Sequence, residues 1–149
     1  MEIAVLALGC FWGPEIKFDK LEGVTKTEVG YCGGNSDTTT YEKVCLGNTN
    51  HAEVVKLEFD PKKISYEKIL QYFFEIHDPT TLNAQGPDIG TQYRSEIFYE
   101  TDVQKKEAEV AISEKNPIFD GKIQTNISKI KNYCKAEEYH QRYIEKKKK

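Results

Sequence analysis

The sequence predicts an α+β fold in which a split β-α-β (ferredoxin-like) antiparallel sheet carries helices on one face and long loops near the active site. The first observation is the order of the predicted elements, β-α-β-β-α-β followed by a further helix. The second is the pair of long polar loops, at residues 31–50 and 80–94. Long loops in a compact domain are usually functional, so we expect them to contribute to a site.

Four strands are predicted from apolar runs or alternating patterns. Residues 3–8 form an apolar run that ends at Gly9, and residues 52–59 place Glu53 on one strand face with Val55, Leu57 and Phe59. Weaker patterns predict the other two strands, at residues 24–29 and 95–99.

The helices are predicted from start signals, stop signals and apolar spacing. Pro14 suits the first turn of a helix that runs from Cys10 or Phe11 towards Leu21. Ser65 can cap a helix that continues through His77. The remaining segments are a helix at 102–115 capped by Asp102, an extended segment at 123–130, and a weakly helical segment at 137–147.

Composition indicates one globular domain that spans residues 1–149. Hydrophobic residues make up 38% and charged residues 30%, with a net charge of -3. This balance does not suggest a nucleic-acid partner, and no apolar stretch is long enough to cross a bilayer. Since residues 3–8 are too short for a signal-peptide core, we expect a cytoplasmic chain, and the lysines at 146–149 read as a solvated terminus.

The four cysteines, at positions 10, 32, 45 and 134, contain no Cys-x-x-Cys pair. Structural zinc sites usually need such close pairs, so no metal is expected. A disulfide framework is not expected either, because the chain is long enough to fold without one. These thiols therefore either pack or carry chemistry.

Cys10 stands where a strand is predicted to turn into a helix, within the segment 9–13 of sequence GCFWG. The helix N-terminus favours a thiolate, and the flanking glycines permit a tight turn. The alternative is a buried cysteine that packs as a small hydrophobe, and for Cys10 alone the two readings are about even. Phe11 and Trp12, the only tryptophan, favour a site.

Six ordered segments, which span almost the whole chain, resemble the peptide methionine sulfoxide reductases of the A type. These segments are 9–13 (GCFWG), 30–34 (GYCGG), 51–55 (HAEVV), 77–81 (HDPTT), 85–95 (QGPDIGTQYRS) and 136–141 (AEEYHQ). The resemblance implies thiol-dependent reduction of methionine-S-sulfoxide, free or in proteins and peptides, as repair of oxidative damage. It implies no cofactor beyond an external thiol such as thioredoxin.

The resemblance also assigns roles by position. Cys10 matches the nucleophile, and Glu53 matches the acid. In the family, two tyrosine hydroxyls bind the substrate oxygen, and a carboxylate helps to place the substrate and the site water. Tyr41 and Tyr93 match the tyrosines, and Asp88 matches the carboxylate. Phe11 and Trp12 match the aromatic wall for the substrate methyl group.

These residue types suit the reaction. A sulfoxide sulfur accepts a thiolate once its oxygen is protonated or hydrogen-bonded, and the oxygen then leaves on the cysteine as a sulfenic acid. The apolar face around Glu53 would raise the pKa of that carboxyl, and tyrosine hydroxyls are uncharged donors. On residues alone, Glu53 could equally be a solvated edge carboxylate, Tyr41 and Tyr93 ordinary loop aromatics, and Asp88 a turn residue.

Regeneration of the thiol requires a second cysteine or direct reduction by an external thiol. Many family members carry the resolving cysteine in a C-terminal Gly-rich tail, which the residues up to Lys149 lack. Cys134 is our candidate, because it lies nearest the C-terminus in a segment expected to be mobile. Cys45 matches a cysteine that is structural in the family, and Cys32 is expected to pack.

Two other function classes remain open. Cys10 could serve a hydrolase or acyl transferase with a histidine as base, although none of the three histidines lies in its segment and all three are expected to be structural. The chain could also be a redox-sensing or sulfoxide-binding module that does not turn over. We expect a monomer.

Overall fold

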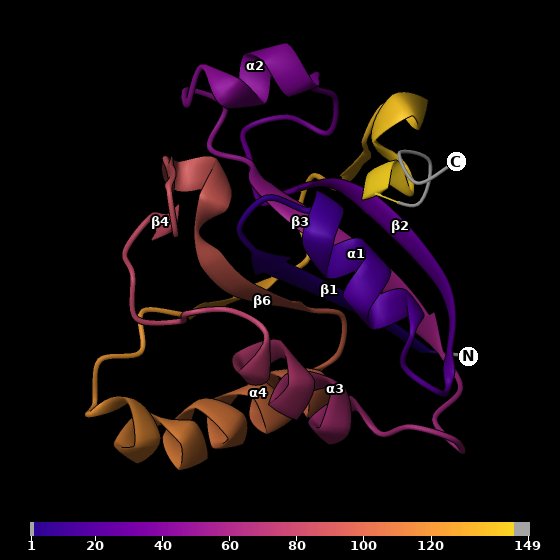
Figure 1. Ribbon diagram of the computed structural model, residues 1–149, viewed down its shortest axis with the longest axis vertical. Helices are drawn as coiled ribbons and strands as arrows, with labels where there is room; N and C mark the ends of the chain where they lie inside the picture. Colours follow the sequence, from indigo (N-terminus) through magenta and orange to yellow (C-terminus); the bar gives the residue numbers. More distant parts are fainter. Residues whose placement is uncertain (1, 145–149) are drawn as a thin grey trace.

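The computed structural model describes residues 2–144, which form a six-stranded sheet with helices packed on one face (Figure 1). The strands are β1 (Glu2–Leu8), β2 (Val24–Cys32), β3 (Ala52–Phe59), β6 (Ser95–Tyr99), β7 (Asn126–Lys129) and β8 (Cys134–Lys135). Their order across the sheet is β7-β6-β1-β3-β2-β8, and neighbours are antiparallel except for the parallel pair β6 and β7. The central order β6-β1-β3-β2 is that of a split β-α-β fold, which confirms the predicted fold class.

The helices are α1 (Trp12–Asp19), α2 (Tyr41–Cys45), α3 (Tyr66–Glu75) and α4 (Asp102–Lys115). The side chain of Ser65 caps α3 by accepting a hydrogen bond from the backbone N–H of Lys68, as predicted. The predicted cap of α4 is wrong by one residue, since Thr101 accepts the capping bond and Asp102 is the first helical residue. Among the described residues, no helix is both long and apolar enough to cross a membrane.

The main core lies between the sheet and its helices. Leu6, Leu57 and Phe59 of the sheet pack there with Phe18 of α1 and Phe73 of α3, and all five are fully buried. The opposite face carries a smaller core whose largest ring is Phe98, covered by Ile130 and Tyr133 from the segment between β7 and β8. Both faces of the central strands are therefore sealed, which fixes the strand register.

The two predicted loops contain short elements that the sequence did not reveal. The first holds α2, which Thr40 caps through its side chain. The second holds a hairpin of β4 (Ala84–Gln85) and β5 (Asp88–Ile89), followed by a 3-10 turn at Thr91–Tyr93. Elements of two to five residues are too short to show a hydrophobic period, so pattern analysis cannot detect them.

The C-terminal prediction of a helix over 137–147 is wrong for residues 137–142, whereas Tyr143 and Ile144 are helical. Residues Glu138–His140 form a 3-10 turn, and Arg142 has a φ of 54°, which a helix cannot accommodate. Gln141 explains the irregular path, because its side chain accepts from the backbone N–H of Val29 and donates to the carbonyl of Val29, both at 2.9 Å. Residues 145–147 of the predicted helix, and the lysines at 146–149, lie outside the described residues.

Candidate active site

Cys10 lies at the junction between β1 and α1, where its side chain is half-buried. The turn requires glycine at position 9, since Gly9 has a φ of 95° and a Cβ there would lie 2.7 Å from the Cβ of Gln85. The strand end is thus held against the loop of β4, which brings the second predicted loop to the cysteine.

The expected stabilisation of a Cys10 thiolate is wrong for the resting structure. Burial raises the pKa of the thiol to about 11, and the charges of Glu53 and Asp88 act in the same direction. A hydrogen bond from the backbone N–H of Trp12, at the start of α1, opposes this shift but does not outweigh it. Cys10 therefore rests as a thiol at neutral pH.

Glu53 is the buried acid that the sequence predicted. It lies on β3 opposite Tyr31 and is 1% exposed. One carboxyl oxygen accepts from the backbone N–H of Phe11 at 3.3 Å, whereas Oε2 is buried and has no hydrogen-bond partner among residues 2–144. Burial raises the pKa of Glu53 to about 8, so the predicted upward shift is confirmed and the carboxyl is mainly protonated at neutral pH.

Asp88 and Tyr93 belong to the second predicted loop, which reaches Cys10 because Asp88 pairs with Gln85, the residue that lies against Gly9. Asp88 lies on β5 and Tyr93 ends the 3-10 turn that follows. Burial raises the pKa of Tyr93 to about 12, with the charges of Glu53, Asp88 and Cys10 adding to the shift. The 3-10 turn that ends at Tyr93 packs against β3, the strand of Glu53, so the second loop brings Asp88 and Tyr93 to the end of the sheet that carries Cys10 and Glu53.

Tyr41 approaches the same end of the sheet from α2. Its ring centroid lies 4.4 Å from that of His140 and 6.4 Å from that of Trp12. Burial raises the pKa of the Tyr41 hydroxyl, and a hydrogen bond to Cys45 adds to this shift. The structure therefore brings all five predicted polar residues to one end of the sheet.

The two aromatic residues of the predicted methyl-binding wall differ in their surroundings. Phe11 has no exposed surface and packs against Tyr31 and His140, with ring centroids 5.7 and 5.3 Å away. Trp12 is half-buried, and its ring stacks on Tyr143 at 4.0 Å. Only Trp12 is therefore placed to touch a substrate in this structure, whereas Phe11 supports it from behind.

Two residues that sequence reasoning did not assign to the site also organise it. His140 accepts a hydrogen bond from the indole N–H of Trp12 at 2.9 Å. The carboxylate of Glu137 accepts from the Tyr31 hydroxyl and from the backbone N–H of Tyr41, each at 2.9 Å. Both residues lie in the segment 136–141. The resemblance of this segment to the family is the sequence feature that could have identified them as site residues.

Each of the three histidines has a hydrogen-bond partner other than Cys10. His77 is hydrogen-bonded to the carbonyl of Phe73 and the hydroxyl of Ser95, and His51 to the carbonyl of Ser36. With His140 bonded to Trp12, the geometry does not favour a cysteine hydrolase, which needs a histidine base beside the sulfur.

Comparison with known proteins settles the family. The family model described as peptide methionine sulfoxide reductase matches residues 2–149. The chain belongs to this family. A relative from Pelagibacter ubique (strain HTCC1062), named peptide methionine sulfoxide reductase MsrA, is 73% identical over 98% of this chain and 99% of its own. The predicted family and its oxidoreductase class are therefore confirmed.

Solved structures show the same fold. The reductase superposes on Mxr1 from Saccharomyces cerevisiae in reduced form with a TM-score of 0.95 and 42% identity, over 99% of this chain and 86% of that one. Mxr1 in complex with Trx2 matches with a TM-score of 0.68 and 30% identity, over 89% of this chain and 78% of that one.

The remaining cysteines of the reductase occupy three different environments. Cys32 is fully buried, and its thiol donates to the carbonyl of Lys131 at 3.4 Å, so the expectation that it packs is confirmed. Cys134 does not lie in a loose segment as expected, because β8 pairs with β2 and sets Cys134 opposite Tyr31. Cys45 is exposed at the end of α2, so it is not a packing residue.

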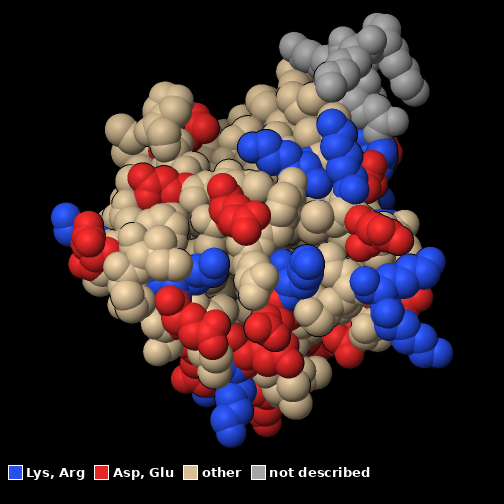
Figure 2. All heavy atoms as spheres, turned by 60° about the horizontal axis from the view of Figure 1, so that its bottom comes forward, with Lys and Arg blue, Asp and Glu red and all other residues tan. Residues whose placement is uncertain are grey.

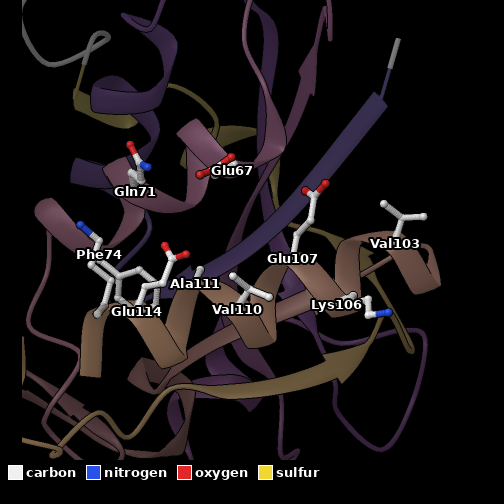
Figure 3. A pocket seen from close by; sticks show the side chains of 10 residues that line it. Glu67, Gln71, Phe74, Val103, Lys106, Glu107, Val110, Ala111 and Glu114 are labelled. Carbon is white, nitrogen blue, oxygen red and sulfur yellow. The ribbon is translucent and has the colours of Figure 1, made fainter. Parts of the chain in front are cut away.

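A groove of about 430 Å³ lies between α3 and α4 of the reductase, far along the chain from Cys10 (Figure 3). Phe74, Val110 and Ala111 line it together with acidic and basic side chains. Figure 2 shows that charges of both signs are interspersed on this side of the molecule. The residues that line the groove include no cysteine, histidine or tyrosine, so the groove lacks the thiol nucleophile and the hydroxyl donors that reduction of a sulfoxide requires. Within residues 2–144, no three His, Cys, Asp or Glu side chains form a metal-binding group.

Proposed function

We propose that Cys10 of this reductase takes the oxygen from the S epimer of methionine sulfoxide, with Glu53 as the acid. The observation that carries the proposal is the carboxyl of Glu53, which is buried, mainly protonated at neutral pH, and has one oxygen without a partner. The oxygen of a bound sulfoxide can accept the hydrogen bond that the protonated Glu53 carboxyl would donate. An acid that holds its proton near neutral pH is what activation of a sulfoxide requires.

In the first step, Glu53 shares its proton with the sulfoxide oxygen while the hydroxyls of Tyr41 and Tyr93 donate hydrogen bonds to it. These uncharged donors stabilise the negative charge that the oxygen gains. Cys10 loses its proton and the sulfur–oxygen bond of the substrate breaks as the oxygen transfers to Cys10. The products are methionine and Cys10 sulfenic acid, so Cys10 is oxidised and the substrate sulfur is reduced.

The neighbouring side chains position the substrate. Trp12 is the aromatic surface for the methyl group, with its ring orientation set by His140 and Tyr143. Asp88 places the substrate and site water, as the family resemblance implies. Because Glu53 is neutral in this step, it exerts no repulsion on the developing Cys10 thiolate, which the charged form would do.

We further propose that thioredoxin or a similar external dithiol returns Cys10 to the thiol state, without a resident cofactor. The complex of the similar protein Mxr1 with Trx2 supports this partner. The substrates would be methionine sulfoxide in peptides and proteins, as repair of oxidative damage. The protein would act in the cytoplasm as a monomer, with residues 1–149 as a single domain.

Steady-state turnover on the two separated epimers of a blocked methionine sulfoxide tests the proposal, with dithiothreitol as reductant. The S epimer should yield methionine and the R epimer none. Cys10→Ser should lose the activity, whereas Cys32→Ser, on the opposite face of the sheet, serves as the matched thiol control. Substantial turnover by Cys10→Ser would refute the proposal.

A further inference from the structure

His140 is a buried imidazole inside a group of aromatic rings at the site. It ends the 3-10 turn Glu138–His140 and is 1% exposed. Four rings surround it, with centroids 5.3, 5.6, 4.4 and 4.2 Å from its own: those of Phe11, Trp12, Tyr41 and Tyr139. The first three rings belong to residues that match substrate-binding positions of the family. The imidazole is therefore placed to act on the site through its neighbours.

The hydrogen bond from Trp12 determines which nitrogen of His140 carries the proton. The indole N–H is a donor only, so Nδ1 of His140, which lies 2.9 Å from it, must be the acceptor. A neutral imidazole has one acceptor nitrogen, and its proton therefore lies on Nε2. Nε2 is buried and has no hydrogen-bond partner among residues 2–144. Within this part of the chain, Trp12 is thus the hydrogen-bond partner of the imidazole.

The orientation of the Trp12 ring depends on this hydrogen bond. The indole is half-buried at the first residue of α1, and its face stacks on Tyr143 at 4.0 Å with an interplanar angle of 15°. Stacking alone allows a ring to slide and to turn in its plane, whereas the bond to His140 fixes one edge. The imidazole is itself held in place, because Gln141, the next residue, is bonded to Val29 on β2.

We propose that neutral His140 is a positioning residue that holds the Trp12 ring for the substrate methyl group, and that uptake of a proton by the imidazole releases the ring and weakens substrate binding. This inference rests on the proposed function, because that function assigns the Trp12 ring to the methyl group. In an imidazolium both nitrogens are donors, so Nδ1 can no longer accept from the indole. The added proton therefore sets two N–H groups against each other.

Titratable side chains face His140 from the elements packed against it. Tyr41 of α2 and Tyr139 of the same turn are phenols whose pKa is raised by desolvation, so both are neutral. Glu137, which precedes the turn, is charged, and its charge favours the imidazolium. The two rings from α1 do not titrate. Burial outweighs the effect of Glu137 and lowers the pKa of His140 from the usual 6.5.

Release of the ring affects binding rather than the reacting groups. Burial raises the pKa of Cys10 to about 11 and that of Glu53 to about 8, so both hold their protons across the acid range in which His140 titrates. Loss of one neutral hydrogen bond corresponds to binding that is roughly three- to tenfold weaker. We therefore expect the Kd for the substrate to rise by this factor as His140 takes up its proton.

The fluorescence of Trp12, the only tryptophan of the chain, tests the hydrogen bond without any turnover. An imidazolium beside an indole quenches its emission more strongly than a neutral imidazole does. The full chain is titrated between about pH 4.5 and pH 8, with far-ultraviolet circular dichroism at each pH to establish that it is folded. The emission of the wild type should change in one step with a midpoint below 6.5.

Two histidine variants assign this step. In His140→Asn, the amide oxygen lies about where Nδ1 does and can accept from the indole but does not titrate, so the step should be absent. His51→Gln, the control, removes another buried histidine whose pKa is lowered by burial, and the step should remain. A wild type without the step, or His140→Asn with it, would overturn the proposal.

Single-turnover kinetics with protein in excess over blocked methionine-S-sulfoxide separate binding from oxygen transfer. The dependence of the rate on protein concentration gives Kd, and the plateau gives the transfer rate. His140→Phe, which has a ring but no acceptor, should bind roughly three- to tenfold more weakly than the wild type at neutral pH. His140→Asn should restore much of the affinity, and its Kd should not rise in acid.

The Kd values decide the binding role of His140. Equal acid weakening in the wild type and His140→Asn, or a His140→Phe variant that binds as tightly as the wild type, would overturn the proposal. In Trp12→Phe, which lacks the indole N–H, His140→Phe should weaken binding no further. The same further weakening as in the wild type would contradict the proposal. Absence of methionine from the wild type at every pH would overturn the proposed function, whereas the fluorescence step tests the hydrogen bond independently.

Discussion

At the residue scale, the site depends on one carboxyl whose surroundings keep it neutral. Glu53 lies on a strand face of large apolar side chains and has a single hydrogen bond, from the backbone N–H of Phe11. Desolvation of the charged form raises the pKa of Glu53 to about 8. The same burial raises the pKa of Cys10 to about 11, so both groups carry protons in the resting enzyme.

These two shifts predict the pH profile of the oxygen-transfer step. The fraction of Cys10 thiolate grows about tenfold per pH unit below its pKa, whereas protonated Glu53 is lost as pH rises through about 8. The single-turnover rate of the wild type should therefore climb up to about pH 8 and then level off. Rapid quench with analysis of methionine measures it.

Glu53→Gln provides the matched comparison, because glutamine retains the shape and the acceptor for Phe11 but does not titrate. The variant should be slower at neutral pH by about two orders of magnitude, and its rate should continue to climb above pH 8. A plateau at the same pH in both proteins would assign the titration to a group other than Glu53.

At the residue scale, the sequence predicted the chemistry better than the electrostatics. The clustering of Cys10, Glu53 and Tyr93 followed from motif resemblance, and the raised pKa of Glu53 from its strand face. The raised pKa of Cys10 was missed, because a helix N-terminus is visible in sequence whereas the burial that opposes it depends on loops packed from elsewhere.

At the element scale, side-chain hydrogen bonds attach the C-terminal segment to β2 beyond the point where the backbone pairing of β8 ends. The Gln141 side chain bonds both backbone polar groups of Val29 on β2, and its amide also donates to the carbonyl of Ala136 at 3.0 Å. This clamp positions the turn that carries His140. Such a clamp could not be predicted, because one glutamine in sequence carries no signal of its distant partner.

We predict that Gln141→Ala destabilises the fold by about 1–3 kcal/mol, because the buried N–H of Val29 loses its acceptor. Urea unfolding followed by tryptophan fluorescence measures the change. Gln71→Ala, at an exposed position on α3, is the control and should alter the free energy of unfolding by less than about 0.5 kcal/mol. Equal losses in the two variants would show that the clamp contributes nothing.

Strands and helices with a clear hydrophobic period were predicted close to their observed bounds, as β3 and α3 show. The predicted helix at 137–147 failed over residues 137–142, because its weak pattern was overridden by tertiary contacts of Gln141 and Arg142. Cys134 was assigned to a mobile segment for the same reason, since the two-residue strand β8 exists only through its pairing with β2.

At the scale of the whole molecule, buried acids and histidines shape the pH dependence of stability in opposite directions. Burial raises the pKa of Glu53 from 4.5 to about 8, so its contribution to folding declines as pH rises between these two values and is lost above about pH 8. Burial lowers the pKa of His77 to about 4, so stability is lost as pH falls below the usual histidine range. Burial shifts the pKa of His51 and His140 in the same direction as that of His77.

The free energy of unfolding should therefore be greatest at roughly pH 6.5 and fall by about pH 9. Glu53→Gln should remove most of the loss between pH 6.5 and pH 9, and it should steepen the rise in stability between about pH 4.5 and pH 6.5, where Glu53 opposes the histidines. Urea unfolding of both proteins across this range measures the effect. If the wild type and the variant lose the same stability between pH 6.5 and pH 9, Glu53 is charged or solvated in the folded state.

The central claim, that oxygen passes from the substrate to the sulfur of Cys10, is tested most directly by isotope transfer. Blocked methionine-S-sulfoxide labelled with heavy oxygen is given in a single equivalent to the triple variant Cys32→Ser, Cys45→Ser, Cys134→Ser, which retains Cys10 as its one thiol, and the tryptic peptides are analysed by mass spectrometry. The account predicts the labelled oxygen on peptide 1–17, at Cys10, with one unlabelled methionine formed per chain. Methionine formed while Cys10 gains no label would contradict it.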